Sequence, residues 1–342
     1  MDRLSAFAAG ACAPLLLAAA LCAGCADKPD RAALAREEAA KPPPPHLRFE
    51  YHDAVLMNLH HFLYDAARNP DHLANAAWAV PPSAQDMAAL QDAVAFYAQH
   101  YAKQDPLFDP GLVAIKHALS VSDDALARAD GLALPADLVA VLDRAAPVYL
   151  RVLWPRHQQA DQLWINNVST LNARYGDEIQ ARIEHALAHK FPPTIRVDIV
   201  YDTGTFQGAF TDANPPQSVI PSSRPTYNGE ASLEMLWHEA AHTGAVDTLV
   251  AEIDANVKAQ HRAPADQLWH ATQFYTVGYV VQDIYKYAGS IDYTPYATKN
   301  GLYARAWPTY LPLLETDWQA WLTGRGTMRQ AVEKMVAKLP PA

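Results

Sequence analysis

The sequence predicts an α+β fold that is predominantly α-helical, with a small antiparallel sheet inside a helical shell. Long stretches carry the 3.6-residue periodicity of helices, and one short region between them alternates as β-strands do. No linker-like stretch or internal repeat follows residue 46. The chain has 342 residues, of which 50% are hydrophobic, and this is ample for a sizeable core. We therefore expect residues 47–342 to form a single domain.

The N-terminus predicts export. A weakly basic start precedes residues 6–23, an uncharged and Ala-rich stretch that is too short for a comfortable membrane span. The sequence Ala-Gly-Cys25 that follows resembles a bacterial lipobox, although Cys22 stands where an aliphatic residue is usual. We expect residues 1–25 to be a signal peptide of the lipoprotein type, with ordinary cleavage as the alternative. Because Ala26 is not an acidic retention signal, the resemblance implies an outer-membrane anchor that faces the periplasm.

Residues 26–46 are expected to form a tether between this anchor and the folded domain. The segment is charged and Ala-rich, and four prolines at residues 42–45 make its end stiff and extended. The chain has 3 cysteines, and all lie in the signal region. The mature domain therefore has no intramolecular disulfide, and His, Asp and Glu must supply any metal site.

The domain is expected to begin with a series of helices, which the periodicity places at residues 51–67, 85–104, 110–129, 136–154 and 156–190. Residues 194–201 alternate and are rich in β-branched side chains, which predicts a strand, with shorter strands at 204–211 and 218–220. A helix then starts near Ser232, a suitable N-cap. Further helical segments follow at residues 247–260, 264–287, 303–324 and 327–339.

The helix that begins near Ser232 carries the most informative motif of the chain. His238 and His242 flank Glu239 in the pattern H-E-x-x-H. Residues four apart project from the same face of a helix, so the two imidazoles can hold one zinc ion while another protein group supplies a third ligand. Glu239 can take a proton from a water molecule bound at the remaining position, as in the hydrolysis of amide bonds.

The surrounding pattern supports this interpretation. Leu233, Leu236, Trp237 and Ala240 form one apolar stripe, and the histidines fall on the other side of the helix. The alternative is a surface helix that carries two solvated histidines.

Short strands followed directly by an H-E-x-x-H helix resemble the zincin metallopeptidases, over roughly residues 194–285. This resemblance implies a zinc cofactor and an edge strand beside the zinc helix that holds the substrate backbone in extended form. Ala245 and Thr248 stand where the metzincin subclass needs Gly and then His or Asp, so the gluzincin-like arrangement, with a ligand from a later helix, is favoured.

His270 is the first candidate for the third ligand, because its distance along the chain suits a second antiparallel helix that crosses the first. Asp266 lies one turn earlier and is a candidate for orienting the ring. Glu252 is the main alternative ligand, followed by Asp247 and Asp254. His270 also shares a stripe with apolar residues of its helix, so a core histidine bonded to a carbonyl is the competing interpretation.

A peptidase of this kind also needs a donor that stabilises the oxyanion. Tyr275 is the candidate that the sequence offers on the third-ligand helix, with Tyr279, Tyr296 and Arg305 as alternatives. The chain has 16 tyrosines, so most of them must be packing or surface residues.

Charge and the remaining motifs narrow the function. The net charge is -10 and the isoelectric point is near 5.7, which argues against a nucleic-acid partner. The sequence contains no glycine-rich phosphate loop, G-x-S-x-G elbow or dinucleotide fingerprint. The favoured interpretation is a zinc-dependent hydrolase of peptide or protein substrates, anchored in the bacterial envelope through an N-terminal lipid. The alternative is a non-catalytic helical lipoprotein, a scaffold or binding module, with an incidental motif.

Overall fold

A four-stranded mixed sheet lies at the centre of the fold, in the order β1-β2-β4-β3. The computed structural model describes residues 46–204 and 208–342, so the predicted signal peptide and almost all of the tether lie outside the described residues. Strands β1 (Arg48–His52), β2 (Thr194–Val200) and β4 (Pro216–Pro221) are parallel. Strand β3 (Phe210–Ala213) pairs with β4 in the antiparallel direction and forms one edge of the sheet.

The predominantly helical α+β class is confirmed, but the expected antiparallel sheet is wrong. Two parallel pairs make the difference, β2 with β4 and β1 with β2. The residues of β1 overlap the start of the helix predicted at 51–67. That helix begins only at Val55. The partner of β1 is β2, more than 140 positions later, so no local turn signal marks the pairing. The β3 prediction was also too early in the chain, since the strand covers 210–213 rather than 204–211.

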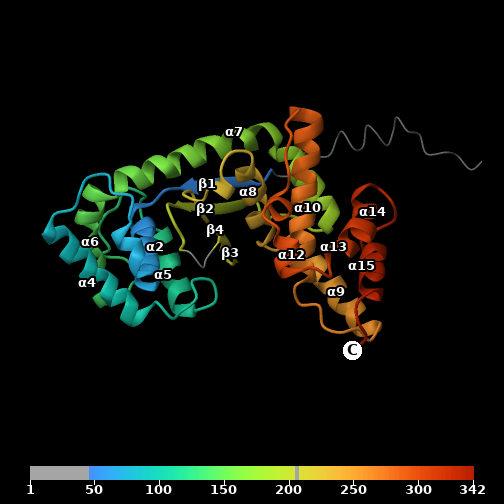
Figure 1. The fold of residues 1–342 in the computed structure, drawn as a ribbon, viewed down its shortest axis with the longest axis horizontal. Helices are drawn as coiled ribbons and strands as arrows, with labels where there is room; N and C mark the ends of the chain where they lie inside the picture. Colours follow the sequence, from blue (N-terminus) through green and yellow to red (C-terminus); the bar gives the residue numbers. More distant parts are fainter. Residues whose placement is uncertain (1–45, 205–207) are drawn as a thin grey trace, which may run out of the picture. The chain divides into compact units, whose positions relative to one another are not determined.

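The first five helices after β1 form one half of the molecule, on the left in Figure 1. They enclose one apolar cluster, to which the sheet contributes Val200, Phe210 and Val219. These helices are α2 (Val55–Arg68), α3 (Pro70–Ala74), α4 (Ala84–His100), α5 (Pro110–Ser120) and α6 (Ala136–Val152).

The helices after β4 form the other half of the molecule and enclose a second apolar cluster together with the opposite face of the sheet (Figure 1). They are α8 (Ala231–Ala241), α9 (Asp247–Ala259), α10 (Leu268–Ile284), α11 (Tyr296–Lys299), α12 (Leu302–Ala306), α13 (Leu311–Leu313), α14 (Gln319–Leu322) and α15 (Met328–Ala337). The helix predicted at 303–324 is therefore interrupted, with the break at residues 307–310.

Short irregular helical turns connect some of these elements. A 3-10 turn (Pro225–Tyr227) precedes α8, and π-helical turns follow α10 (Tyr285–Gly289) and α13 (Leu314–Trp318). Among the described residues, no helix combines the length and the hydropathy that a membrane span requires.

The long helix α7 (Trp154–Leu187) positions the start of α8. The Trp164 indole donates to the Tyr227 carbonyl at 2.9 Å, and Asn167 Nδ2 donates to both the Gly229 carbonyl and Ser232 Oγ at 2.9 Å. Ser232 is not the N-cap that the sequence predicted, because α8 starts one residue earlier and the Ser232 hydroxyl donates to the Gly229 carbonyl inside the first turn. Four contacts from α7 and the turn thus hold the entry to α8.

Trp237 anchors α8 to the rest of the core. Its side chain is 1% exposed, lies edge-on to Phe49 of β1 and Phe191, and donates from its indole nitrogen to Asn172 Oδ1 at 3.0 Å. The residue therefore links β1, α7 and α8.

We expect Trp237→Ala to lower the free energy of unfolding by about 3–5 kcal/mol, because it removes a large buried ring and leaves a cavity at this junction. Urea unfolding followed by circular dichroism measures the change. Leu163→Ala on the exposed side of α7 is the control and should change stability by no more than about 0.5 kcal/mol. Equal effects of the two variants would contradict the anchoring role of Trp237.

Candidate metal centre

Helix α8 is buried on nearly all sides, and its H-E-x-x-H segment lies between the sheet and α10. His238 is 2% exposed and Glu239 is 4% exposed, whereas His242, at the end of the helix, is half-buried. The motif is therefore not on the solvated surface helix that was the alternative in the sequence analysis.

Helix α10 crosses α8 in the antiparallel direction and brings His270 to the histidine pair. His238 contacts Phe274, whereas His242, one turn further along α8, contacts Trp269, which precedes Phe274 on α10. The rings of both α8 histidines also lie next to His270, with centroids 5.4 and 5.1 Å away. The structure thus places the third-ligand candidate from the sequence opposite the motif.

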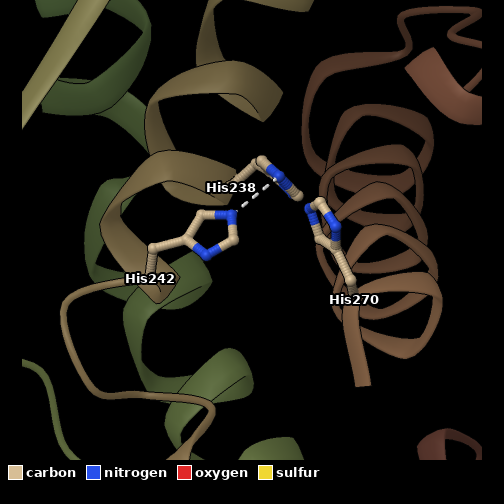
Figure 2. Close-up of side chains that lie close together, drawn as sticks. All are labelled: His238, His242 and His270. Carbon is tan, nitrogen blue, oxygen red and sulfur yellow. Dashed lines mark hydrogen bonds between the residues drawn. The ribbon is translucent and has the colours of Figure 1, made fainter. Parts of the chain in front are cut away.

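The three imidazoles point toward a common centre (Figure 2). Their ligand atoms all lie within 4.8 Å of one another, and the Nε2 atoms of His238 and His242 are 3.3 Å apart. Two nitrogen ligands of a tetrahedral zinc ion, each at about 2.0–2.1 Å, are separated by about 3.3–3.4 Å. The spacing of the α8 pair fits a shared ion of this size.

The protonation states also fit a metal ligand set. Burial and the neighbouring imidazoles hold the pKa of His238 well below its usual value, and burial followed by the charge of His270 lowers the pKa of His242 to about 3. Burial lowers the pKa of His270 to about 4. At neutral pH all three rings are neutral, which is the form that binds a metal ion. The buried Nε2 of His270 has no hydrogen-bond partner in the part of the chain that the structure describes.

Aromatic side chains fix the orientation of the rings. Phe274 stacks on His238 with centroids 3.7 Å apart, and Trp269 stacks on His270 at 4.9 Å. Trp307 lies edge-on to His270 at 5.3 Å. The surroundings of the three nitrogens are therefore mostly apolar, which strengthens electrostatic interactions at this point.

Glu239 lies between the histidines and the sheet edge. The Thr211 hydroxyl of β3 donates to its Oε2 at 2.8 Å, and the Ser218 hydroxyl of β4 lies 2.9 Å from the Thr211 oxygen. Burial raises the pKa of Glu239 to about 7, although the hydrogen bond from Thr211 opposes this shift. A carboxyl group with a pKa near neutrality is suited to accepting and returning a proton.

The acidic alternatives for the third ligand lie elsewhere. Glu252 pairs with Arg329 at 2.8 Å, and Asp247 and Asp254 are exposed. Asp266 is exposed too, and among the described residues no hydrogen bond joins it to His270. The structure therefore brings together the three histidines but none of the carboxylates that the sequence offered as ligand or orienting group.

The Tyr275 side chain lies apart from the three histidines. The Tyr275 hydroxyl donates to Gln319 Oε1 of α14 at 3.2 Å, and its ring contacts Tyr303. Phe274, not Tyr275, occupies the face of α10 that meets His238, and successive helical residues point about 100° apart. Tyr275 is thus directed away from the three histidines.

Two other tyrosines lie near the candidate centre. Tyr296, one of the alternatives from the sequence, stacks against Phe274 at 6.2 Å and contacts Tyr227 at 5.4 Å. Burial, and to a smaller extent the charges of Tyr296 and Glu239, raise the pKa of Tyr227. The sequence did not indicate Thr211 or Tyr227 as neighbours of Glu239, because neither the alternation of β3 nor the 3-10 turn that carries Tyr227 reveals which helix lies against it.

Comparisons with protein-family models, with curated proteins and with solved structures find no match to this chain. The geometry of the site is therefore the basis for inferring the function.

We expect the full chain, after dialysis, to retain about one zinc ion and the His238→Ala variant to lose it, because two ligands hold an ion much less tightly than three. Elemental analysis measures the metal. His100→Ala, at the exposed end of α4, is the matched control and should leave the metal content unchanged.

Thermal melts of all three proteins separate a loss of ligand from a loss of fold. Retention of the metal by a folded His238→Ala protein would contradict the assignment, as would a metal-free wild-type chain at micromolar free zinc.

Proposed function

We propose that this protein is a zinc-dependent hydrolase that cleaves peptide or amide bonds. The observation that carries the proposal is the convergence of His270 from α10 on the His238–His242 pair, with the Glu239 carboxylate beside them. A non-catalytic scaffold with an incidental motif would need no imidazole opposite the pair.

The donor set suits zinc. Three neutral imidazoles satisfy three positions of a tetrahedral ion and leave one open, as catalytic zinc sites do. When bound, zinc lowers the pKa of a water ligand and polarises the carbonyl of the substrate. The unpartnered Nε2 of His270 supports this assignment, because a buried imidazole nitrogen without a partner carries a free-energy cost that an ion would remove.

Glu239 is the proposed general base. The hydrogen bond from Thr211 holds one carboxylate oxygen, so the other is free to receive a proton from the attacking water. The same group can then pass this proton to the leaving amine.

The edge of the sheet suggests how a substrate is held. Thr211 belongs to β3, and within residues 46–204 and 208–342 no strand pairs with the outer edge of β3. An extended peptide that adds to this edge would run past Glu239, and main-chain hydrogen bonds would supply its affinity. This arrangement favours a peptide or protein substrate over a small amide.

We place the enzyme on the periplasmic side of the bacterial envelope, attached to the outer membrane by a lipid at Cys25. The support is the lipobox-like sequence before Cys25 and the proline-rich tether that follows it.

The Glu239→Gln variant should keep its metal but lose hydrolysis of a peptide library by about 10²–10⁴-fold in kcat, because the amide cannot accept the proton. Glu333→Gln, on an exposed position of α15, is the control and should be as active as the wild type. Equal cleavage by the Glu239→Gln variant would rule out the proposed mechanism, and a metal-loaded wild-type chain that cleaves no peptide would favour the scaffold.

Tyr296 replaces Tyr275 as the proposed oxyanion donor. We expect Tyr296→Phe to lower kcat by about 10–10³-fold with little change in KM, because the hydroxyl acts mainly on the charge that develops during the reaction. Tyr275→Phe is the matched control on α10 and should leave kcat unchanged. The reverse order of effects in steady-state assays would restore Tyr275 as the donor.

A further inference from the structure

A second cluster of metal-ligand side chains lies in the other half of the molecule. Asp65 belongs to the last turn of α2, His72 to α3, and Asp202 follows the end of β2. Each offers one ligand atom, and these atoms all lie within 4.8 Å of one another. His72 Nδ1 is 2.6 Å from Asp65 Oδ2, and Asp65 is 2% exposed.

The backbone is shaped to bring these carboxylates together. Gly204 has φ +100°, and a Cβ at this position would lie 2.5 Å from Asp65 Oδ1, so only glycine permits the loop to approach so closely. The Gly204 amide donates to Asp202 Oδ1 at 2.9 Å, which fixes the second carboxylate on the same loop. The backbone of this turn therefore holds the carboxylates of Asp65 and Asp202 close to each other.

The cluster borders a hollow of about 390 Å³, and a buried imidazole lines the same space. His157 is 1% exposed, its Nδ1 is hydrogen-bonded to the Tyr149 hydroxyl at 2.8 Å, and its ring stacks on Tyr201 with centroids 4.0 Å apart. This imidazole therefore adds a polar ring to the wall of the hollow that the cluster borders.

The two carboxylates of the cluster favour a bound cation, because together they carry two negative charges. An ion pair between a protonated His72 and Asp65 neutralises only one of the two carboxylates, whereas a divalent cation balances both. One imidazole with two carboxylate ligands suits Mn²⁺, whereas Ca²⁺ and Mg²⁺ prefer oxygen ligands alone.

We propose that Asp65, His72 and Asp202 bind a divalent transition-metal ion at a second site, separate from the three histidines of α8 and α10. A water on this ion would have space in the hollow and an acceptor or donor in His157. The ion would tie α2 and α3 to the loop after β2, so its role is to stabilise this junction. The inference does not depend on the proposed hydrolase function.

Mn²⁺ is the probe for the experiment, because free Mn²⁺ gives an electron paramagnetic resonance signal that bound Mn²⁺ largely loses. Two proteins serve as backgrounds for the Mn²⁺ titration. The first is the full chain with His238→Ala and His242→Ala, which lacks the three-histidine cluster. The second is the wild-type chain with zinc bound at that cluster. We expect about one Mn²⁺ per chain in either background, and a rise in Tm of about 5 °C at 100-fold the Kd.

Asp202→Asn tests the site with little risk to the fold, because the amide oxygen can still accept from Gly204. We expect it to weaken Mn²⁺ binding by about tenfold or more and to reduce the rise in Tm by about half or more at the same Mn²⁺ concentration, since a ligand charge is lost. Asp71→Asn is the matched control, because Asp71 lines the same hollow but is not part of the cluster, and its binding should be unchanged. Absence of Mn²⁺ binding in both backgrounds would overturn the proposal, and so would equal binding by Asp202→Asn and Asp71→Asn.

Discussion

The contact between α8 and α10 is the interaction on which the candidate centre depends. Gln273 Nε2 donates to the His238 carbonyl at 2.7 Å, and Phe274 stacks on the His238 ring, so backbone and side chain of the motif are both fixed by α10. One turn before His238, the fully buried Glu234 accepts from the Tyr293 hydroxyl at 2.6 Å and from the Tyr296 amide at 2.9 Å. Burial raises the pKa of Glu234 to about 7, and these two hydrogen bonds offset part of the cost. One face of α8 therefore organises both the ligand set and the loop that carries Tyr296.

Local patterns predicted the motif helix well, but pairing between distant segments was beyond them. The apolar stripe and the H-E-x-x-H spacing define α8 within eleven residues, so the sequence contains what is needed. Strand β1 is different, because it covers only residues 48–52 and the strand that pairs with it in the described part of the chain is β2, which follows six helices later. Periodicity over such a short stretch cannot distinguish a strand from the first turn of the helix behind it, and hence the parallel part of the sheet was missed.

The rotation of α10 about its axis is a second property that local patterns do not give. Helix α10 is buried almost all round, with polar residues such as Thr272, Gln273 and Thr276 as fully buried as the apolar ones. An amphipathic pattern assigns faces only when one side is solvated, so the pattern of α10 alone could not tell which side meets α8. The position of His270 does give this information: once His270 faces the motif, Tyr275, five residues later at about 100° per residue, points about 140° away from it.

The two candidate metal sites are joined by the sheet. Asp202 follows β2, and nine positions later Thr211 of β3 donates to Glu239. A cation at Asp65, His72 and Asp202 would hold Asp202 in place, and Thr211, which donates to the proposed base Glu239, follows soon after it in the chain. Its removal should then loosen the Thr211–Glu239 contact without touching the three histidines. In Asp202→Asn, zinc content would then stay the same while the catalytic rate fell, because the three histidines would remain while Glu239 lost its hydrogen-bond donor.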